Sequence, residues 1–358
     1  MDLYKSITLK QTTDLIQAVG HQTTVLAQGE MGIGKSSILK TLKERLGDSH
    51  RYCYVDMTTK DVGDFLVPKI RDIDGTEVCS FIPNEEFGFH FTKPVVMMLD
   101  EIGKVGKTVL NPCLRLMLER KLGTYALPEG SIVFATTNLS IEGVGDNLPP
   151  HARNRVTVVK VAKPTAEQWI EDYALDNGIL PEVILAVKQF PQMFQSFEDV
   201  QDPKDNEYIN DPRMPRPSFV THRSMETASN LLRNGKGLPD AVISHSLIGT
   251  IGTRATYDMM AMVRLANDLP DWDSIIKDPT NTRVPDSPSA VCMLVYSAVQ
   301  RIEKDSVNAW VKYMGRISKE AQGLFATSVM RTKKASTVGT SKEFIKWATD
   351  NNYLFARA

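Results

Sequence analysis

The stretch Gly29–Ser36, GEMGIGKS, constrains the fold of this chain more than any other feature. It fits the pattern G-x-x-x-x-G-K-[ST] of a phosphate-binding loop. A short apolar run at 24–28, TVLAQ, comes before it, and a helical pattern from about Lys35 to Leu46 follows. A strand, a glycine-rich turn and a helix in this order gather backbone N–H groups and a helix N-terminus around one anion. The stretch therefore predicts a phosphate site in an α/β protein, and the alternative is a glycine-rich turn with a chance lysine.

Further apolar runs predict the rest of a parallel sheet. They are RYCYVDM at 51–57, PVVMMLDE at 94–101, SIVFATTN at 131–138 and RVTVVKV at 155–161. Continuous apolar strands that alternate with helices are typical of a parallel sheet covered on both faces. With the run at 24–28 they predict a core of five parallel strands. Between the second and third runs, two β-like segments around Asp74-Gly75 predict an inserted hairpin at about 67–82.

After the fifth apolar run the sequence pattern changes from strand-like to helical. We expect three regions, namely an α/β core, a helical region and a further C-terminal helical region, over residues 1–162, 163–268 and 269–358. The second region contains a polar, proline-rich insertion at about 197–217. In the third region Ser287-Pro288 suits an N-cap and a first helical position. Two or three more helices are expected to finish the chain.

Composition limits the classes of function. The 358 residues are 42% apolar and carry a net charge of −1, so no general basic surface for nucleic acid or an anionic membrane is expected. The four cysteines form no Cys-x-x-Cys pair, which is typical of reduced thiols. The apolar runs are too short to cross a bilayer. We therefore expect a cytoplasmic protein with no membrane partner.

The loop residues have separate predicted roles. The glycines let backbone N–H groups turn toward phosphate oxygens, Lys35 reaches the β- and γ-phosphates, and Ser36 ligates Mg²⁺. The expected nucleotide-binding residues are Gly29, Glu30, Met31, Gly32, Ile33, Gly34, Lys35, Ser36 and Ser37.

Polar residues end two of the apolar runs. Asp100 is predicted to hold Mg²⁺, directly or through water, and Glu101 to polarise the attacking water as a general base. Asn138 is predicted to orient that water. The alternatives are an acidic helix N-cap for Asp100-Glu101 and a turn-forming role for Asn138. Because a protein that only holds its nucleotide needs no general base, Glu101 favours hydrolysis.

Two arginines, Arg153 and Arg155, stand just before the last apolar run. One interpretation is a solvated basic turn, the usual place of surface arginines. The other is an arginine finger that stabilises transition-state charge at the nucleotide of a neighbouring subunit.

Residues 12–161 resemble the AAA+ ATPases, and among them the MoxR-like branch of the helix-2-insert clade, in a bacteriophage or bacterial member. The resemblance rests on GEMGIGKS as Walker A, VVMMLDEI as Walker B, the hairpin DIDGTEVCSFIPNEEF and the run NPCLRLMLERKLGTYALPEGSIVFATTN, in this order. It implies ATP and Mg²⁺ as the nucleotide and its metal ion. It also implies that the helical region after the core is a lid and that Asn138 is the sensor 1 residue.

The resemblance implies further residue roles. Arg155 matches the finger arginine of the family, with Arg153 as the second choice, although the flanking residues differ from the family's Asp-Arg-Phe. Arg223 matches the sensor 2 arginine of the lid, although the family's preceding proline is absent. A finger that serves the next subunit implies a ring-shaped homo-oligomer, expected to be a hexamer. The hairpin is expected to face the central pore or the client, with a stabilising flap as its alternative.

The family's usual role is that of an ATP-hydrolysing, chaperone-like machine that remodels or matures a protein complex. Its client is a protein, and many members work with a von Willebrand factor A domain partner. Two other functions stay open for this chain. One is a nucleic-acid motor or loader, which the basic run near 331–342 suggests and the net charge opposes. The other is a nucleotide-gated scaffold with little turnover. GTP is the alternative to ATP.

Overall fold

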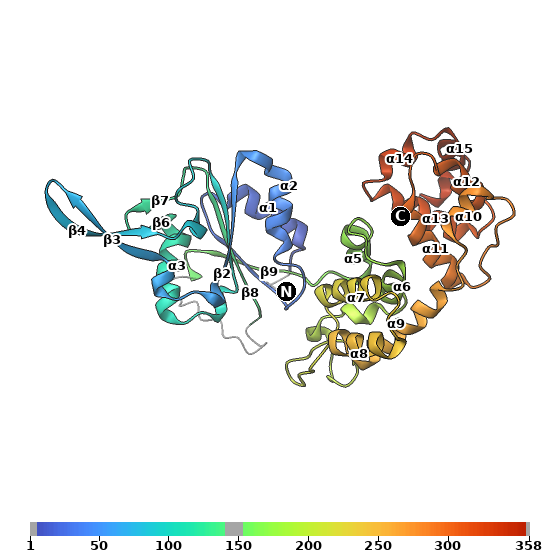
Figure 1. The fold of residues 1–358 in the computed structure, drawn as a ribbon, viewed down its shortest axis with the longest axis horizontal. Coiled ribbons are helices and arrows are strands. Elements are labelled where there is room, and N and C mark those ends of the chain that lie inside the picture. The colour runs from blue at the N-terminus through green and yellow to red at the C-terminus, as the bar shows by residue number, and fades with distance from the viewer. Residues whose placement is uncertain (1–5, 140–152, 356–358) are drawn as a thin grey trace. The chain divides into compact units, whose positions relative to one another are not determined.

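The computed structural model describes residues 6–139 and 153–355 of the chain. These residues form two compact units, of which the first ends at Lys163 and the second begins at Pro164 (Figure 1). No helix among the described residues combines the length and the apolar character that crossing a membrane would require.

A five-stranded sheet forms the centre of the first unit (Figure 1). Its strands are β1 (Val25–Gln28), β2 (Arg51–Asp56), β5 (Val95–Asp100), β8 (Ile132–Thr137) and β9 (Thr157–Lys160). They lie in the order β2-β5-β8-β1-β9, and every neighbouring pair is parallel. Each strand falls within one of the five apolar runs, so the predicted parallel α/β core is confirmed.

Helices cover both faces of this sheet, which explains why its strands are apolar at successive positions. On one face α1 (Leu9–Val19) and α2 (Ser37–Leu46) pack on the strands through apolar residues such as Ile16 and Leu42. On the other face α3 (Lys107–Glu119) contributes a second apolar cluster. All six residues of β5 are buried as a result.

A partly buried arginine, Arg120, fixes the approach to β1. Arg120 ends α3 and donates hydrogen bonds to the hydroxyl of Thr24 at 2.9 Å and to the carbonyl of Gly20 at 2.8 Å. Burial lowers the pKa of Arg120 to about 10. The guanidinium thereby connects the end of α3 to the turn that leads into the strand before the phosphate loop.

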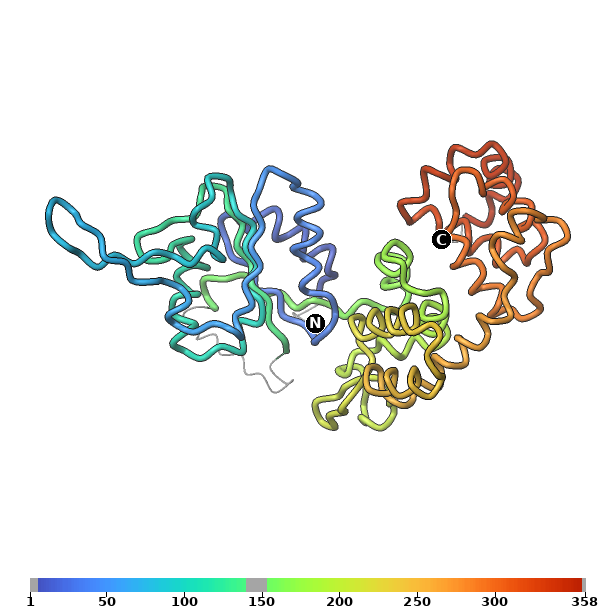
Figure 2. Tube along the Cα trace, viewed as in Figure 1, coloured from blue at the N-terminus to red at the C-terminus, as the bar shows by residue number. Residues whose placement is uncertain are grey.

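The predicted hairpin is present. Strands β3 (Leu66–Ile73) and β4 (Thr76–Pro83) pair antiparallel around Asp74 and Gly75, whose φ angles are 54° and 79°. Two successive positive φ values are typical of a type I′ turn. Figure 2 shows the hairpin projecting from the first unit, and Ile70 and Phe81 are exposed on it. A second, shorter pair joins β6 (Lys121–Leu122) to β7 (Tyr125–Ala126).

The second unit is helical. Its helices are α5 (Ala166–Trp169), α6 (Pro181–Gln189), α7 (His222–Asn234), α8 (Asp240–Ile251), α9 (Thr253–Ala266), α10 (Trp272–Lys277), α11 (Pro288–Arg301), α12 (Val307–Met314), α13 (Lys319–Met330), α14 (Ala335–Gly339) and α15 (Lys342–Asp350). Ser287 caps α11 as predicted, since its side chain accepts a hydrogen bond from the amide of Ala290. Among the described residues four helices follow α11, where two or three were expected. Two of the four, α12 and α14, have eight and five residues, too few for a clear apolar period.

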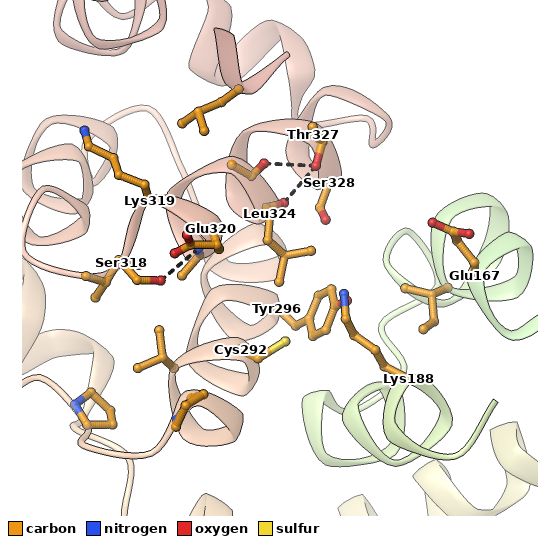
Figure 3. A pocket seen from close by; sticks show the side chains of 18 of the residues that line it. Glu167, Lys188, Cys292, Tyr296, Ser318, Lys319, Glu320, Leu324, Thr327 and Ser328 are labelled. Atoms are coloured by element: carbon orange, nitrogen blue, oxygen red, sulfur yellow. Dashed lines mark hydrogen bonds between the residues drawn. The ribbon is translucent and has the colours of Figure 1, made fainter. Parts of the chain in front are cut away.

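Helices from the two predicted helical regions pack together in this unit. The ammonium of Lys188 in α6 donates to the hydroxyl of Tyr296 in α11 at 3.0 Å. A cavity of about 1290 Å³ lies beside this contact, with Cys292 and Glu167 on its walls (Figure 3). Burial raises the pKa of the Tyr296 phenol above its usual value. The boundary at residues 268 and 269 stays a prediction.

Candidate nucleotide-binding site

The order of the strands brings the predicted site residues to one edge of the sheet. The phosphate loop follows β1, Asn138 follows β8, and Asp100 ends β5. The carboxyl ends of parallel strands meet at the same edge, and β8 lies between β1 and β5. Asn138 is therefore placed between the loop lysine and the carboxylates.

The ammonium of Lys35 is held at the centre of the site. It donates hydrogen bonds to the carbonyls of Gly29 and Glu30 and to Oδ1 of Asn138, each at 2.8 Å. A lysine ammonium has three N–H donors, so these three bonds use all of them. The side chain is buried and aimed at the loop and at the end of β8. The structure thus brings Lys35 and Asn138 into direct contact.

The loop needs glycine at particular positions. Gly34 has a φ of 97°, in a region that residues with a side chain rarely adopt. A Cβ on Gly29 would lie 3.1 Å from the carbonyl oxygen of Val161, beyond the end of β9. The hydroxyl of Ser37 donates to the carbonyl of Gly34 at 2.7 Å, while Ser36 at the start of α2 makes no capping hydrogen bond with its side chain.

Two hydroxyl groups orient the carboxylate of Asp100. Oδ1 accepts a hydrogen bond from the hydroxyl of Thr136, and Oδ2 accepts one from the hydroxyl of Tyr54 at 2.8 Å. Donors that fix a carboxylate in this way are typical of residues that position a metal ligand. The chain order alone did not identify Tyr54 or Thr136, because they reach Asp100 only through the lateral pairing of β2, β5 and β8.

Glu101 has an unusual backbone. Its φ of 58° lies in the left-handed region, which is uncommon for residues other than glycine and which clusters at functional sites. Oε1 of Glu101 accepts a hydrogen bond from Nδ2 of Asn138 at 3.1 Å. The ammonium of Lys104 lies 3.1 Å from Oε2 as an ion partner. Lys104 was also not predicted from the sequence, although its spacing of three residues from Glu101 could have identified it as an ion partner.

These side-chain contacts form one connected network. Lys35 binds Asn138, Asn138 binds Glu101, and Glu101 pairs with Lys104. A cation suited to phosphate is thereby connected through one amide to a carboxylate suited to accept a proton. The arrangement can hold a phosphate and a water molecule side by side.

The residues also suit a magnesium ion. No group of three or more His, Cys, Asp or Glu that could hold a metal occurs in the described part of the chain. Magnesium at phosphate sites needs no such group, because it takes one or two protein oxygens and completes its shell with phosphate and water. Asp100 and Ser36 provide a carboxylate and a hydroxyl of the required kinds.

Two of the predicted arginines, Arg153 and Arg155, lie in the first unit but away from this cluster, and the third, Arg223, belongs to the second unit. Arg153 and Arg155 are exposed and precede β9, whose first residue pairs with the first residue of β1. They therefore stand at the amino ends of the strands, opposite the edge that carries the phosphate loop. Arg223 is the second residue of α7 in the second unit, and Thr221 caps this helix. The roles of all three stay predictions.

The fold and the site define the first unit as an α/β unit with a glycine-rich loop of the phosphate-loop type between β1 and α2. No protein-family model matches the chain, and no curated protein matches it. Among solved structures, a point mutant of RuvB from Thermotoga maritima is 13% identical with a TM-score of 0.36, over 76% of each chain. NtrX from Brucella abortus in complex with ADP is 15% identical with a TM-score of 0.37, over 83% of this chain and 67% of the other. Scores this low add nothing to what the sheet and the loop show.

Proposed function

We propose that this chain is an ATP-hydrolysing AAA+ ATPase of the MoxR-like branch that works as a ring and remodels or matures a protein complex. The observation that carries the proposal is the connected set Lys35, Asn138 and Glu101 beside Asp100. A scaffold that only holds its nucleotide needs the lysine and not the oriented carboxylate. The set therefore favours hydrolysis.

Each residue of the connected set has its own role in the proposed reaction. The Lys35 ammonium, supported by the loop amides, binds the β- and γ-phosphate oxygens of ATP in place of its present carbonyl partners. Ser36 and Asp100 would hold Mg²⁺, which would neutralise phosphate charge. The carboxylate of Glu101 accepts a proton from the attacking water, and the amide of Asn138 keeps water and carboxylate in line.

The arginines support a ring. The edge of the sheet that carries Arg153 and Arg155 is separated from the loop of the same chain by β1, four residues long and about 13 Å at 3.3 Å per residue. A guanidinium at that edge is well placed to serve the nucleotide of another subunit. We propose Arg155 as the finger, Arg153 as its alternative, Arg223 as the sensor 2 residue and a hexamer as the assembly.

The hairpin is the part of the first unit best suited to a protein client. Strand β3 is exposed at seven of its eight positions and β4 at four of eight, and Ile70 and Phe81 present apolar side chains. Exposed apolar side chains on a projecting element are typical of protein contacts. We propose a protein client for this surface in the cytoplasm, with a von Willebrand factor A domain protein as the partner to test first.

Turnover of the assembled protein tests hydrolysis. Glu101→Gln should keep ATP binding and lower the rate of phosphate release by at least about 100-fold, since it removes the general base. The matched control is Glu119→Gln, which changes an exposed glutamate of α3 and should leave the rate unchanged. If the wild type and Glu101→Gln hydrolyse ATP equally slowly, the nucleotide-gated scaffold is the better account.

A further inference from the structure

A buried ion pair connects the phosphate loop to the last residue of the first unit. The ammonium of Lys163 lies 3.0 Å from Oε2 of Glu30, and the two side chains are 7% and 8% exposed. The pair between Arg115 and Glu119 has both side chains at least half exposed. Because solvent ions screen buried charges much less than surface charges, the attraction between Glu30 and Lys163 is screened less than the attraction within that exposed pair.

The position of Glu30 makes its charge important. Glu30 is the second residue of GEMGIGKS, and its carbonyl oxygen accepts a hydrogen bond from the Lys35 ammonium. The loop that binds a polyanion thus contains a carboxylate of the same sign as its ligand. Like charges a few ångströms apart in a partly buried site repel by several kcal/mol unless a counter-charge is present.

The pairing of β1 with β9 places the counter-charge, Lys163, beside Glu30. The ladder between β1 and β9 continues past Gln28, because the amide of Val161 donates to the carbonyl of Gln28 at 2.7 Å. Glu30 follows Gln28 by two residues, and Lys163 follows Val161 by two residues. The two parallel segments therefore carry the carboxylate and the ammonium to the same level beyond the sheet.

We propose that Lys163 is a positioning residue that sets nucleotide affinity by neutralising Glu30. With the pair intact, the loop presents its amides and the Lys35 ammonium to the phosphates without a net negative charge from Glu30. Without the Lys163 ammonium, the carboxylate opposes phosphate binding. The inference rests on the proposed function only in requiring that the loop binds a nucleoside triphosphate.

The direction in which each variant changes the dissociation constant for ATP separates this electrostatic role from a structural one. Lys163→Met removes the positive charge that faces Glu30 and should raise the dissociation constant for ATP about tenfold. Glu30→Gln removes the negative charge of the loop and should lower the dissociation constant. The double variant has neither charge and should return to within about threefold of the parent protein. A purely structural pair would weaken binding in both single variants.

Titration of a fluorescent ATP analogue with Mg²⁺ measures these constants, with each change made in Glu101→Gln so that the nucleotide is not consumed. Lys163→Arg keeps the charge and should bind like the parent. Lys334→Met removes an ion-paired lysine of the second unit and is the control. Circular dichroism melting identifies any variant that does not fold. If a single variant does not fold, the ATP dissociation constant of the double variant, compared with that of the parent, tests the proposal.

The outcomes are distinct. Equal affinity in Lys163→Met and the parent overturns the proposal, and so does weaker binding in both single variants. If the parent protein itself binds no nucleotide, the proposed function fails and this inference fails with it.

Discussion

At the residue scale, two adjacent carboxylates have different surroundings. Asp100 is held by two hydroxyl groups and keeps the backbone conformation of a strand. Glu101 has a left-handed backbone and is held by an amide and an ammonium. The change of conformation between neighbours turns the second carboxylate away from the strand and toward Asn138. Different environments for two like groups are how a site assigns them different roles.

Asn138→Ala tests the central amide. Without Nδ2 the Glu101 carboxylate loses one of its two restraints, so we expect the rate of phosphate release to fall about 100-fold. The dissociation constant for ATP should change by less than about fivefold, because the Lys35 ammonium and the loop amides, and not Asn138, bind the phosphates in the proposed site. Asn352→Ala, at an exposed position in the second unit, is the control. If the Asn138→Ala variant releases phosphate at the wild-type rate, the role of Asn138 is only to form the turn after β8.

At the scale of elements, burial of the sheet explains both what the sequence predicted and what it missed. A strand such as β5 was found because helices bury both of its faces, which makes all of its residues before Asp100 apolar. The hairpin was found because Asp-Gly adopts two positive φ values.

The lateral order of the strands has no local signal in the sequence. The contacts of Tyr54 and Thr136 with Asp100, and of Lys163 with Glu30, depend on that order and were therefore not predicted. The residues that end the strands, Asp100, Glu101 and Asn138, were predicted because a polar residue after an apolar run is visible without knowing its neighbour.

Burial of α3 against the sheet predicts a pH dependence of stability. Burial raises the pKa of the Cys113 thiol from about 9 to about 12. Between these values the unfolded chain loses the thiol proton while the folded chain keeps it, so the free energy of unfolding falls as pH rises. The slope from one thiol is at most about 1.4 kcal/mol per pH unit.

Urea unfolding between pH 8 and pH 10.5 measures this effect. The wild type should lose stability more steeply above pH 9 than Cys113→Ala, with a difference of about 1–2 kcal/mol at the upper end. Parallel curves for the two proteins would show that the thiol does not titrate differently in the folded state.

At the scale of the whole molecule, the two ends of the parallel strands carry different groups. The edge of the sheet with the phosphate loop carries lysine, carboxylates and amide, and the opposite edge carries Arg153 and Arg155. A ring in which one subunit's arginine edge meets the next subunit's loop edge would complete the set of groups for hydrolysis. The proposed ATPase therefore depends on assembly, and activity should rise with protein concentration.

Mixing two inactive variants tests this account most directly. Arg155→Ala should bind ATP without hydrolysing it, and Lys35→Ala should not bind ATP, so each alone should be inactive. In mixed rings an intact loop can meet an intact arginine of the neighbour, and phosphate release should return in part, with a maximum near equal amounts. Absence of recovery at every ratio, with both variants shown to assemble together, would contradict a finger at Arg155 that acts across a subunit boundary.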